Sequence, residues 1–171
     1  MALPRKLKNM NLFNDGNSYL GLSKTVTLPV LGRKMESYRG GGMNGPVKID
    51  HGMSDDGIQL EWTLGGLDLT VLHQYGIPRA DGVLLRWAGA CQQDDTGEVV
   101  PVEVVVRGRH EEIDMGDAEP GEDTEHSITT TCTYYKLSVN GVTVIEIDLL
   151  NMVEIVGGED RLAQQRAAIG L

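Results

Sequence analysis

The chain has 171 residues, enough for one domain with a hydrophobic core, and 40% of them are hydrophobic, which favours a globular over a disordered protein. Its formal net charge of −10 argues against binding to nucleic acid phosphates or to anionic membranes, although it is compatible with a surface past which DNA slides. The 22 glycines lie mostly between β-rich runs, which is typical of a turn-rich β protein.

The N-terminal part of the sequence predicts a basic arm followed by two strands. The arm covers residues 2–11, and a polar turn follows at 14–17. Strands are predicted at 20–28 and 30–38, with Pro29 at a bend or on an edge between them. We expect these two strands to pair as a hairpin or a corner-turning ribbon.

The next part of the chain alternates between a loop, a strand and a helix. Residues 39–57 are rich in glycine, and only 47–49 look strand-like, so a long functional or mobile loop is expected. Residues 58–64 alternate between apolar and polar side chains, which predicts a half-buried strand. Helical spacing of apolar residues within 65–76 predicts one short amphipathic helix covering one side of the sheets.

The second half of the sequence predicts long strands. One strand is expected at 83–92, and the longest at 98–109, which would reach about 40 Å at roughly 3.3 Å per residue. Eight acidic residues between 111 and 125 predict a solvated loop.

The strongest structural signal is a long antiparallel hairpin between Glu125 and Val156. Its two β-rich runs meet at Asn140 and Gly141, and Asn-Gly tolerates the positive φ angles of a type I′ turn. Residues 159–169 then predict a short C-terminal helix.

These elements together predict a single domain, residues 1–171, of the all-β class: an antiparallel β-sandwich or barrel with one internal helix and one C-terminal helix. A long hairpin alone is only marginally stable and leaves open edges. We therefore expect those edges to be covered by the same chain or by another copy of it.

No catalytic, cofactor or metal site is expected. His110-Glu111-Glu112 begins like a zinc protease helix, but Asp114 occupies the position of the required second histidine. The other three histidines lack metal-ligand spacing, and the acidic loop lacks the ordered ligands of a calcium-binding loop. The glycines at 40–42 lack the rest of a phosphate-binding motif, and no serine or cysteine lies in a nucleophile elbow.

The two cysteines and the lengths of the apolar stretches indicate in which cellular compartment the protein is made. Cys91 and Cys132 lack metal-ligand or redox spacing, so we expect reduced, buried thiols. No stretch has the length of a signal peptide core or of a membrane span. We expect a protein made in a cytosol that does not insert into a membrane as a monomer.

A series of short motifs runs in order along nearly the whole chain. The motifs are Ala2–Lys8, Asn11–Phe13, Val26–Pro29, Tyr38–Pro46, Asp94–Glu98, Arg107–Arg109, Glu112–Gly116, Gly121–Glu125, Cys132–Leu137, Ile147–Met152, Asp160–Leu162 and Ile169–Leu171. With these motifs the chain resembles the major tail tube proteins of contractile-tailed bacteriophages, and equally the tube proteins of R-type pyocins and related tailocins.

The resemblance implies a β-sandwich or barrel subunit that joins five copies of itself in a six-membered ring. Rings would stack into a hollow tube inside a contractile sheath, in the virion tail or in a tailocin particle assembled in the bacterial host cytoplasm. The implied partners are further copies of the chain, the tail sheath protein, and baseplate and tail terminator proteins. In a phage, genomic DNA would pass through the lumen without specific binding; in a tailocin, the tube would puncture an envelope.

Two kinds of contact residue are expected from this resemblance. The glycine-rich loop is the expected contact between rings, because glycines allow it to reach and its side chains can bind. The candidate residues in that loop are Tyr38, Arg39, Met43 and Asn44. The basic residues Arg5 and Lys6 of the arm are expected to meet acidic residues of a neighbouring copy.

The lumen is expected to carry carboxylates, so that DNA phosphates are repelled within a Debye length of roughly 8–10 Å. The candidates for these positions are Glu36, Asp50 and Glu61. The sequence alone does not give which face is the inner one.

Two other functions remain open at this stage. One is the effector-secretion tube of a type VI system, built on a related fold. The other is a carbohydrate-binding β-sandwich, which usually offers aromatic platforms; here Trp62 and Trp87 lie at strand positions expected to be core. The sequence does not separate a phage tube from a tailocin tube.

Overall fold

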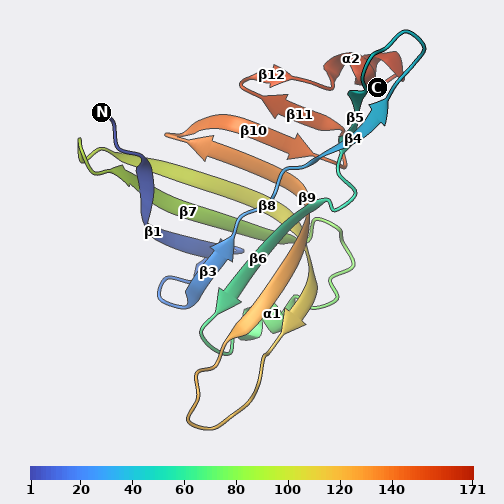
Figure 1. Cartoon of the computed structure of the whole chain (residues 1–171). Coiled ribbons are helices and arrows are strands. Elements are labelled where there is room, and N and C mark those ends of the chain that lie inside the picture. Colours follow the sequence, from blue (N-terminus) through green and yellow to red (C-terminus); the bar gives the residue numbers. More distant parts are fainter.

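The computed structural model describes residues 1–171 and is organised around two long central strands (Figure 1). β8 (Val99–Asp114) is the longest strand and pairs antiparallel with β9 (His126–Val139). Both were predicted, although β8 runs five residues further than the predicted strand 98–109. The all-β, antiparallel class expected from the sequence is confirmed.

Ten of the strands form one hydrogen-bonded sheet that folds over on itself into two layers. The fold arises because β9 has two partners on the same edge: its first half, 126–132, pairs with β6 (Ile58–Leu64), and its second half, 134–139, pairs with β10 (Val142–Asp148). The short layer consists of β3 (Ser23–Thr27), β6, the start of β9 and the end of β8.

The long layer contains the remaining strands of this sheet, in the order β12–β11–β10–β9–β8–β7–β1–β2. Their bounds are β12 Glu159–Asp160, β11 Val153–Val156, β7 Val83–Gln93, β1 Arg5–Asn14 and β2 Asn17–Ser18. Strand β7 was predicted within one residue at its end. The long layer thus joins the N-terminal and C-terminal parts of the chain through β7, β8 and β9.

β8 crosses from one layer to the other at Gly108, where its pairing with β9 is irregular. A Cβ atom at this position would lie 2.0 Å from the backbone oxygen of Thr131, a separation that real Cβ atoms do not show. The close approach of the two backbones therefore requires glycine here.

The expected basic arm is a strand. β1 lies along β7 from Arg5 to Asn14, and its end is buried, with Leu12 and Asn14 both at most 1% exposed. The sequence-based interpretation of an arm is wrong because the charged residues cluster at the start of the strand, where the side chains are exposed, and hide the alternation that follows.

The expected pairing of segments 20–28 and 30–38 is also wrong. β3 pairs with β6, whereas β4 (Arg33–Tyr38) pairs with β5 (Val47–Met53) in a separate two-stranded sheet. The backbone amide of Ser54 donates to the carbonyl of Gly32, so the two pairs follow one another as a single interrupted ribbon. We call β4, β5 and the connecting loop 39–46 the ribbon.

The expected long loop 39–57 therefore shrinks to the ribbon's connection at 39–46. Residues 47–53 are a strand, although Asp50, His51 and Gly52 lower its apparent β propensity. Pairing with β4 outweighs this local preference, which is common for strands.

The hairpin of β9 and β10 has the predicted turn, with positive φ at Asn140 (52°) and Gly141 (75°). Its second strand, however, ends at Asp148 and does not continue to residue 155. The chain reverses over 149–152, and β11 pairs back on β10.

Both predicted helices exist and are shorter than expected. α1 (Leu69–His73) starts at Asp68, whose carboxylate accepts a hydrogen bond from the Thr70 amide. Only Val71 of this helix is buried, so its apolar stripe covers little of the sheet. α2 (Ala163–Ala168) begins after β12, which takes up the first residues of the predicted helix.

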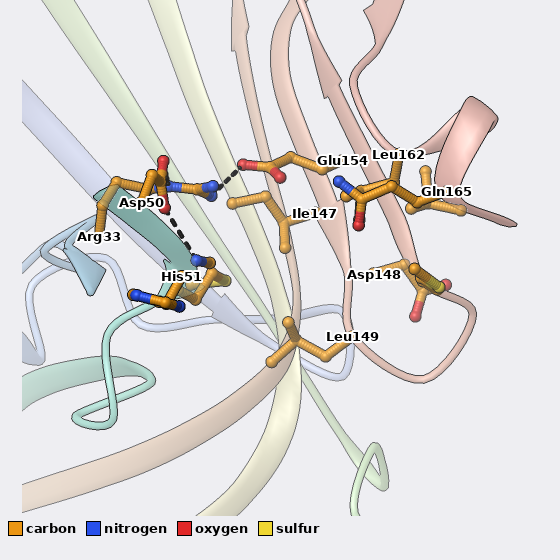
Figure 2. Close-up of a pocket in the computed structure, with 13 residues that line it drawn as sticks. Arg33, Asp50, His51, Ile147, Asp148, Leu149, Glu154, Leu162 and Gln165 are labelled. Atoms are coloured by element: carbon orange, nitrogen blue, oxygen red, sulfur yellow. Dashed lines mark hydrogen bonds and ion pairs between the residues drawn. The ribbon is translucent and has the colours of Figure 1, made fainter. Parts of the chain in front are cut away.

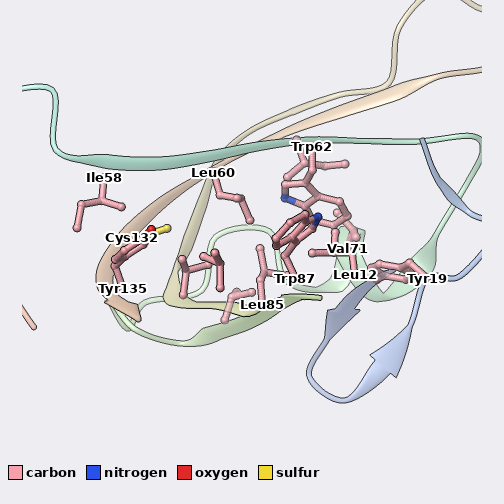
Figure 3. Packing of buried hydrophobic residues seen from close by; sticks show 14 of the residues in the cluster. Leu12, Tyr19, Ile58, Leu60, Trp62, Val71, Leu85, Trp87, Cys132 and Tyr135 are labelled. Atoms are coloured by element: carbon pink, nitrogen blue, oxygen red, sulfur yellow. The ribbon is translucent and has the colours of Figure 1, made fainter. Parts of the chain in front are cut away.

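A cluster of 16 buried apolar residues fills the space between the two layers. Leu60 and Trp62 of the short layer face Leu85 and Trp87 of the long layer, and Val71 closes one end (Figure 3). Burial of these large side chains holds the two layers together, at about 1.5–3 kcal/mol for each aliphatic side chain.

Candidate assembly surfaces

The short layer ends in two open strand edges. β3 pairs with β6 on one side only. At the opposite edge, β8 runs on past its last β7 partner, the pair Gly108 and Val83, so residues 109–114 have a strand neighbour only in β9. Each edge presents unpaired backbone amides and carbonyls, which can accept a strand from another chain.

The outer face of the short layer, pointing away from the core, is polar and mostly acidic. Its uncharged members are Thr25, Thr27, Gln59, Thr63, Ser127, Thr129 and Thr131, and its acidic members are Glu61, Glu111, Glu112 and Asp114. Glu111 is held across three strands, because its Oε2 accepts from Gln59 Nε2 at 3.0 Å and from Thr131 Oγ1 at 2.7 Å. Two basic side chains lie at or beside this face: Arg109 donates to the carbonyl of Pro78 at 3.3 Å, and Lys24 of β3 pairs with Asp123 and Glu125.

The three carboxylates expected to line a lumen lie on two different surfaces. Glu61 lies on the outer face of the short layer, opposite Thr129. Glu36 and Asp50 lie on the ribbon, where Glu36 is 3.5 Å from His51. Asp50 accepts from Arg33 Nε at 2.9 Å, and this bond holds the pKa of its carboxyl below the usual value, so its charge is already balanced.

The ribbon tip carries the four residues expected to contact another ring. Arg39 and Met43 shape the tip itself: Arg39 Nε donates to the Met43 carbonyl at 3.2 Å, and the Gly40 amide lies 3.1 Å from the Met43 sulfur. Tyr38 and Asn44 are exposed. The structure thus brings the four residues together at one exposed turn.

The base of the ribbon is fastened to the body of the protein. Arg33 lies between two carboxylates, with Asp50 on the ribbon and Glu154 on β11, whose Oε1 accepts from Arg33 Nη1 at 2.8 Å (Figure 2). Below this bridge is a cavity of about 460 Å³, with Ile147 and Leu149 among its apolar lining. Sequence reasoning missed Arg33 and Glu154, because nothing local relates two residues 121 positions apart.

The two basic residues of the expected arm differ in their surroundings. Arg5 lies 3.5 Å from Glu98 of the same chain, beside a second pair formed by Lys8 and Asp94 at 2.9 Å. Lys6 is exposed and forms no ion pair within the chain. A contact of either residue with a neighbouring copy stays a prediction.

His110 and the two tryptophans have structural roles in the interior. His110 hydrogen-bonds Thr130 and Gln74 in the interior, and no group of three or more His, Cys, Asp or Glu side chains is arranged to hold a metal ion. Trp62 and Trp87 are both buried, so neither offers an aromatic platform to a sugar. Neither helix is long and apolar enough to cross a membrane.

Open strand edges and a projecting ribbon are features through which β subunits can join further copies of themselves. The family model described as phage tail tube protein FII matches residues 4–170, and the chain therefore belongs to this family. The resemblance seen in the sequence is confirmed, and the protein is a structural component of the virion tail.

Two relatives support this assignment, and one solved structure shares the fold. The chain is 53% identical over 172 residues to the tail tube protein of Escherichia phage P2, covering 100% of both chains. It is 40% identical over 153 residues to the major tail tube protein of Serratia phage KSP20, covering 90% of this chain and 88% of the relative. The fold resembles a chain in the cryo-EM structure of the anti-feeding prophage baseplate, with a TM-score of 0.52 at 12% identity over 81% of this chain and 97% of that one.

Proposed function

We propose that this chain forms rings by pairing the two open edges of its short layer with those of identical neighbours, and that the rings stack into a hollow tail tube. The observation that carries the proposal is the position of the edges: β3 and residues 109–114 of β8 lie at opposite sides of one four-stranded layer. Each copy then contributes one edge of each kind, which is a head-to-tail contact that closes into a ring.

The direction of the strands supports this pairing. Within the short layer, β3 and β6, β6 and β9, and β9 and β8 are all antiparallel. Because the number of strands is even, β3 of one copy and β8 of the next run in opposite directions. A ring made this way is a continuous antiparallel sheet with no edge left open.

A six-membered ring, as the sequence resemblance implies, gives a bore wide enough for double-stranded DNA. Six layers of four strands, spaced about 4.8 Å apart, have a circumference of about 115 Å and a diameter of about 37 Å between backbones. Tilting the strands widens this barrel further. A B-form duplex fits within it.

The outer face of the short layer then lines the bore. Its threonines offer hydroxyl groups, and Glu61, Glu111, Glu112 and Asp114 offer negative charge. Phosphates are repelled at close range by such a wall, and the basic side chains that make proteins adhere to DNA are scarce on it. DNA is therefore conducted without being bound.

The outside of the tube and its two ends meet the other tail components: the sheath on the outside, and the baseplate and tail terminator proteins at the ends. A tailocin tube or a type VI tube requires the same ring, and differs in what passes through it. Electron microscopy of particles from a producing lysate separates them, because phage particles carry a DNA-filled head, tailocins a sheath without a head, and type VI tubes lack the tail-like particle.

The test is hydrogen–deuterium exchange on the purified chain as monomer and as rods, with negative-stain microscopy to establish which is present. We expect the outward-pointing amides within 23–27 and 109–114, which have no partner in the monomer, to exchange at least about tenfold more slowly in rods, because they become hydrogen-bonded. The amides of β7, which has partners on both sides, serve as the control and are protected in both states. Rods in which both edges exchange as fast as in the monomer would show that the rings close through another surface.

A further inference from the structure

The two ends of the molecule complement each other in shape and charge. We propose that the ribbon tip of one copy seats on the opposite end of a second copy in the next ring, with its apolar side chains in a glycine-lined hollow and its basic side chains against the acidic loop. The inference rests on the proposed function, which supplies the rings, and it names the surface that receives the ribbon.

The ribbon is an unpartnered two-stranded sheet with apolar side chains exposed to solvent. Tyr38 and Val47 are cross-strand neighbours at its tip and are 57% and 55% exposed. Lys48, the next residue, forms no ion pair, and Arg39 uses one donor within its own turn and keeps the rest free. Acidic side chains appear only further down, at Glu36 and Asp50, so the tip is basic.

The other end of the molecule has the complementary apolar surface. Leu20 and Leu67 are 71% and 65% exposed there. Leu22, Leu67 and Asp68 line a shallow hollow of about 130 Å³ whose other walls include three glycines. Glycine leaves room for a side chain from outside, and exposed leucines around such a hollow mark a contact surface.

The acidic loop, residues 115–125, lies beside this hollow. The Lys24 ammonium pairs with Asp123 and lies 3.6 Å from Glu125, while its carbon stem passes 3.4 Å from the Cβ position of Gly65 in the hollow. Lys24 is the only cation that pairs with the loop, and Asp117, Glu119 and Glu122 form no ion pair within the chain. Three carboxylates are thus free to meet basic side chains of another copy.

These surfaces cannot meet within one chain. The interrupted ribbon rises from Ser23, next to the hollow, to Tyr38 at the tip, through the two strands β3 and β4 and the segment 28–32 between them. Figure 1 shows the tip and the acidic loop at opposite extremes of the molecule. Two different surfaces at opposite ends make a contact that repeats without closing, which is the geometry of a stack.

The first test fills the hollow. In Gly66→Leu, the new Cβ meets no atom within 4 Å and the backbone φ is not in the left-handed region, so the fold accepts the change. We expect rings in normal yield, with the critical concentration for rods raised about tenfold, equivalent to about 1.4 kcal/mol for each ring added to a rod.

The second test exchanges charges across the contact. Lys48→Glu alone, and Glu119→Lys with Glu122→Lys alone, are each expected to raise the critical concentration for rods about tenfold. Combining all three changes is expected to restore it, because the charges are again opposite. Arg79→Glu, a reversal in the loop before β7, serves as the control and leaves assembly unchanged.

The outcomes separate this inference from the proposed function. Rods that form normally in Gly66→Leu and in both single reversals overturn the inference while leaving rings and tube intact. Loss of rings in these variants, with unchanged thermal melting of the monomer, also overturns it, because the ribbon then acts within a ring. If the unmodified chain forms neither rings nor rods under any condition, the proposed function itself fails.

Discussion

His110 lies in a buried series of hydrogen bonds that runs from Trp62 through Thr130 and His110 to Gln74. Its Nε2 is 2.8 Å from Gln74 Oε1, an atom that only accepts, so Nε2 carries the proton. Its Nδ1 then accepts from the Thr130 hydroxyl at 2.9 Å, and the oxygen of that hydroxyl accepts from Trp62 Nε1 at 3.1 Å. The neutral ring is fully satisfied, and burial lowers the pKa of His110 to about 4.

This low pKa predicts a loss of stability in mild acid. The unfolded chain binds the proton near pH 6.5 and the folded chain near pH 4, so stability from the neutral ring is complete above pH 6.5 and is lost as the pH falls toward 4. The loss amounts to about 3 kcal/mol at pH 4. Urea unfolding of the dissociated chain at pH 7 and pH 4 measures it.

The matched variant is His110→Gln, which cannot titrate. Carboxylates such as Asp50 and Asp123, whose pKa values are lowered by Arg33 and Lys24, also lose stability in acid, but they do so in both proteins. The difference between the two proteins therefore isolates His110. Equal acid losses in the two proteins would mean that the ring is not held neutral in the fold.

Glu61 is the lumen candidate that lies on the face proposed to line the bore, and it forms no ion pair within the chain. In Glu61→Lys, one ring of positive charges attracts phosphates and slows DNA passage, while assembly is unaffected. The delay in DNA release from particles carrying the variant checks this. Glu61→Gln, which removes charge without reversing it, is expected to show a smaller delay, and release at the normal rate in both variants would argue against electrostatic repulsion in the bore.

We expect the ion pair at the base of the ribbon to limit the ribbon's mobility. Arg33 joins it to β11 through Glu154, and both side chains are partly exposed, so the pair contributes little to global stability, at most about 1 kcal/mol. In Glu154→Ala, which leaves the Arg33–Asp50 pair in place, we expect nearly unchanged urea unfolding but faster amide exchange in β4 and β5. Lys34→Ala, at the neighbouring position of β4, removes an exposed pair with Asp55 in the turn after β5 and serves as the control. If exchange in the ribbon is the same in both variants, the bridge to Glu154 does not hold it.

Sequence reasoning succeeded for elements whose signal is local. The Asn140-Gly141 turn, β6, β7 and β8 were predicted because their residues alone define a turn type or an alternating strand. The reversal after β10 contains neither glycine nor proline. It forms because the Asp148 carboxylate accepts hydrogen bonds from the amides of Leu150 and Asn151, at 3.1 and 3.3 Å. An aspartate in a sequence does not by itself indicate such a turn, so the reversal was not predicted.

The assembly surfaces were predicted less well, for a related reason. Asn44 was expected on a loop and lies on one, but β5, which pairs with β4 across the connection 39–46, was missed because Asp50, His51 and Gly52 lower its apparent β propensity. The open edges of β3 and β8 depend on which strands find partners elsewhere in the fold. The receiving hollow between Leu22 and Leu67 likewise joins segments far apart in sequence.

The proposed contacts around a ring and the proposed contacts along the tube use different surfaces of the molecule. Around a ring, the proposed contacts join backbone groups of β3 and β8, which carry no net charge. Along the tube, they join a basic ribbon tip to an acidic loop. With 25 acidic and 15 basic residues, the subunit gains from placing opposite charges at its two ends, because two copies that meet tip to tip or loop to loop bring like charges together.

This separation predicts that salt divides the tube into rings. At 0.1 M salt the Debye length is about 10 Å and the exposed charges between rings attract, whereas at 1 M it is about 3 Å and they are largely screened. Backbone hydrogen bonds within a paired sheet are little affected by the same change. We expect rods assembled at low NaCl to fall apart into intact rings as NaCl is raised, which sedimentation and negative-stain microscopy can follow.

Two variants refine this prediction. The triple charge exchange at Lys48, Glu119 and Glu122 keeps the same salt dependence. Lys48→Glu alone forms rods better at high salt than at low salt, because screening then removes a repulsion. Rods that dissolve directly into monomers would mean that rings and stacks depend on the same contacts.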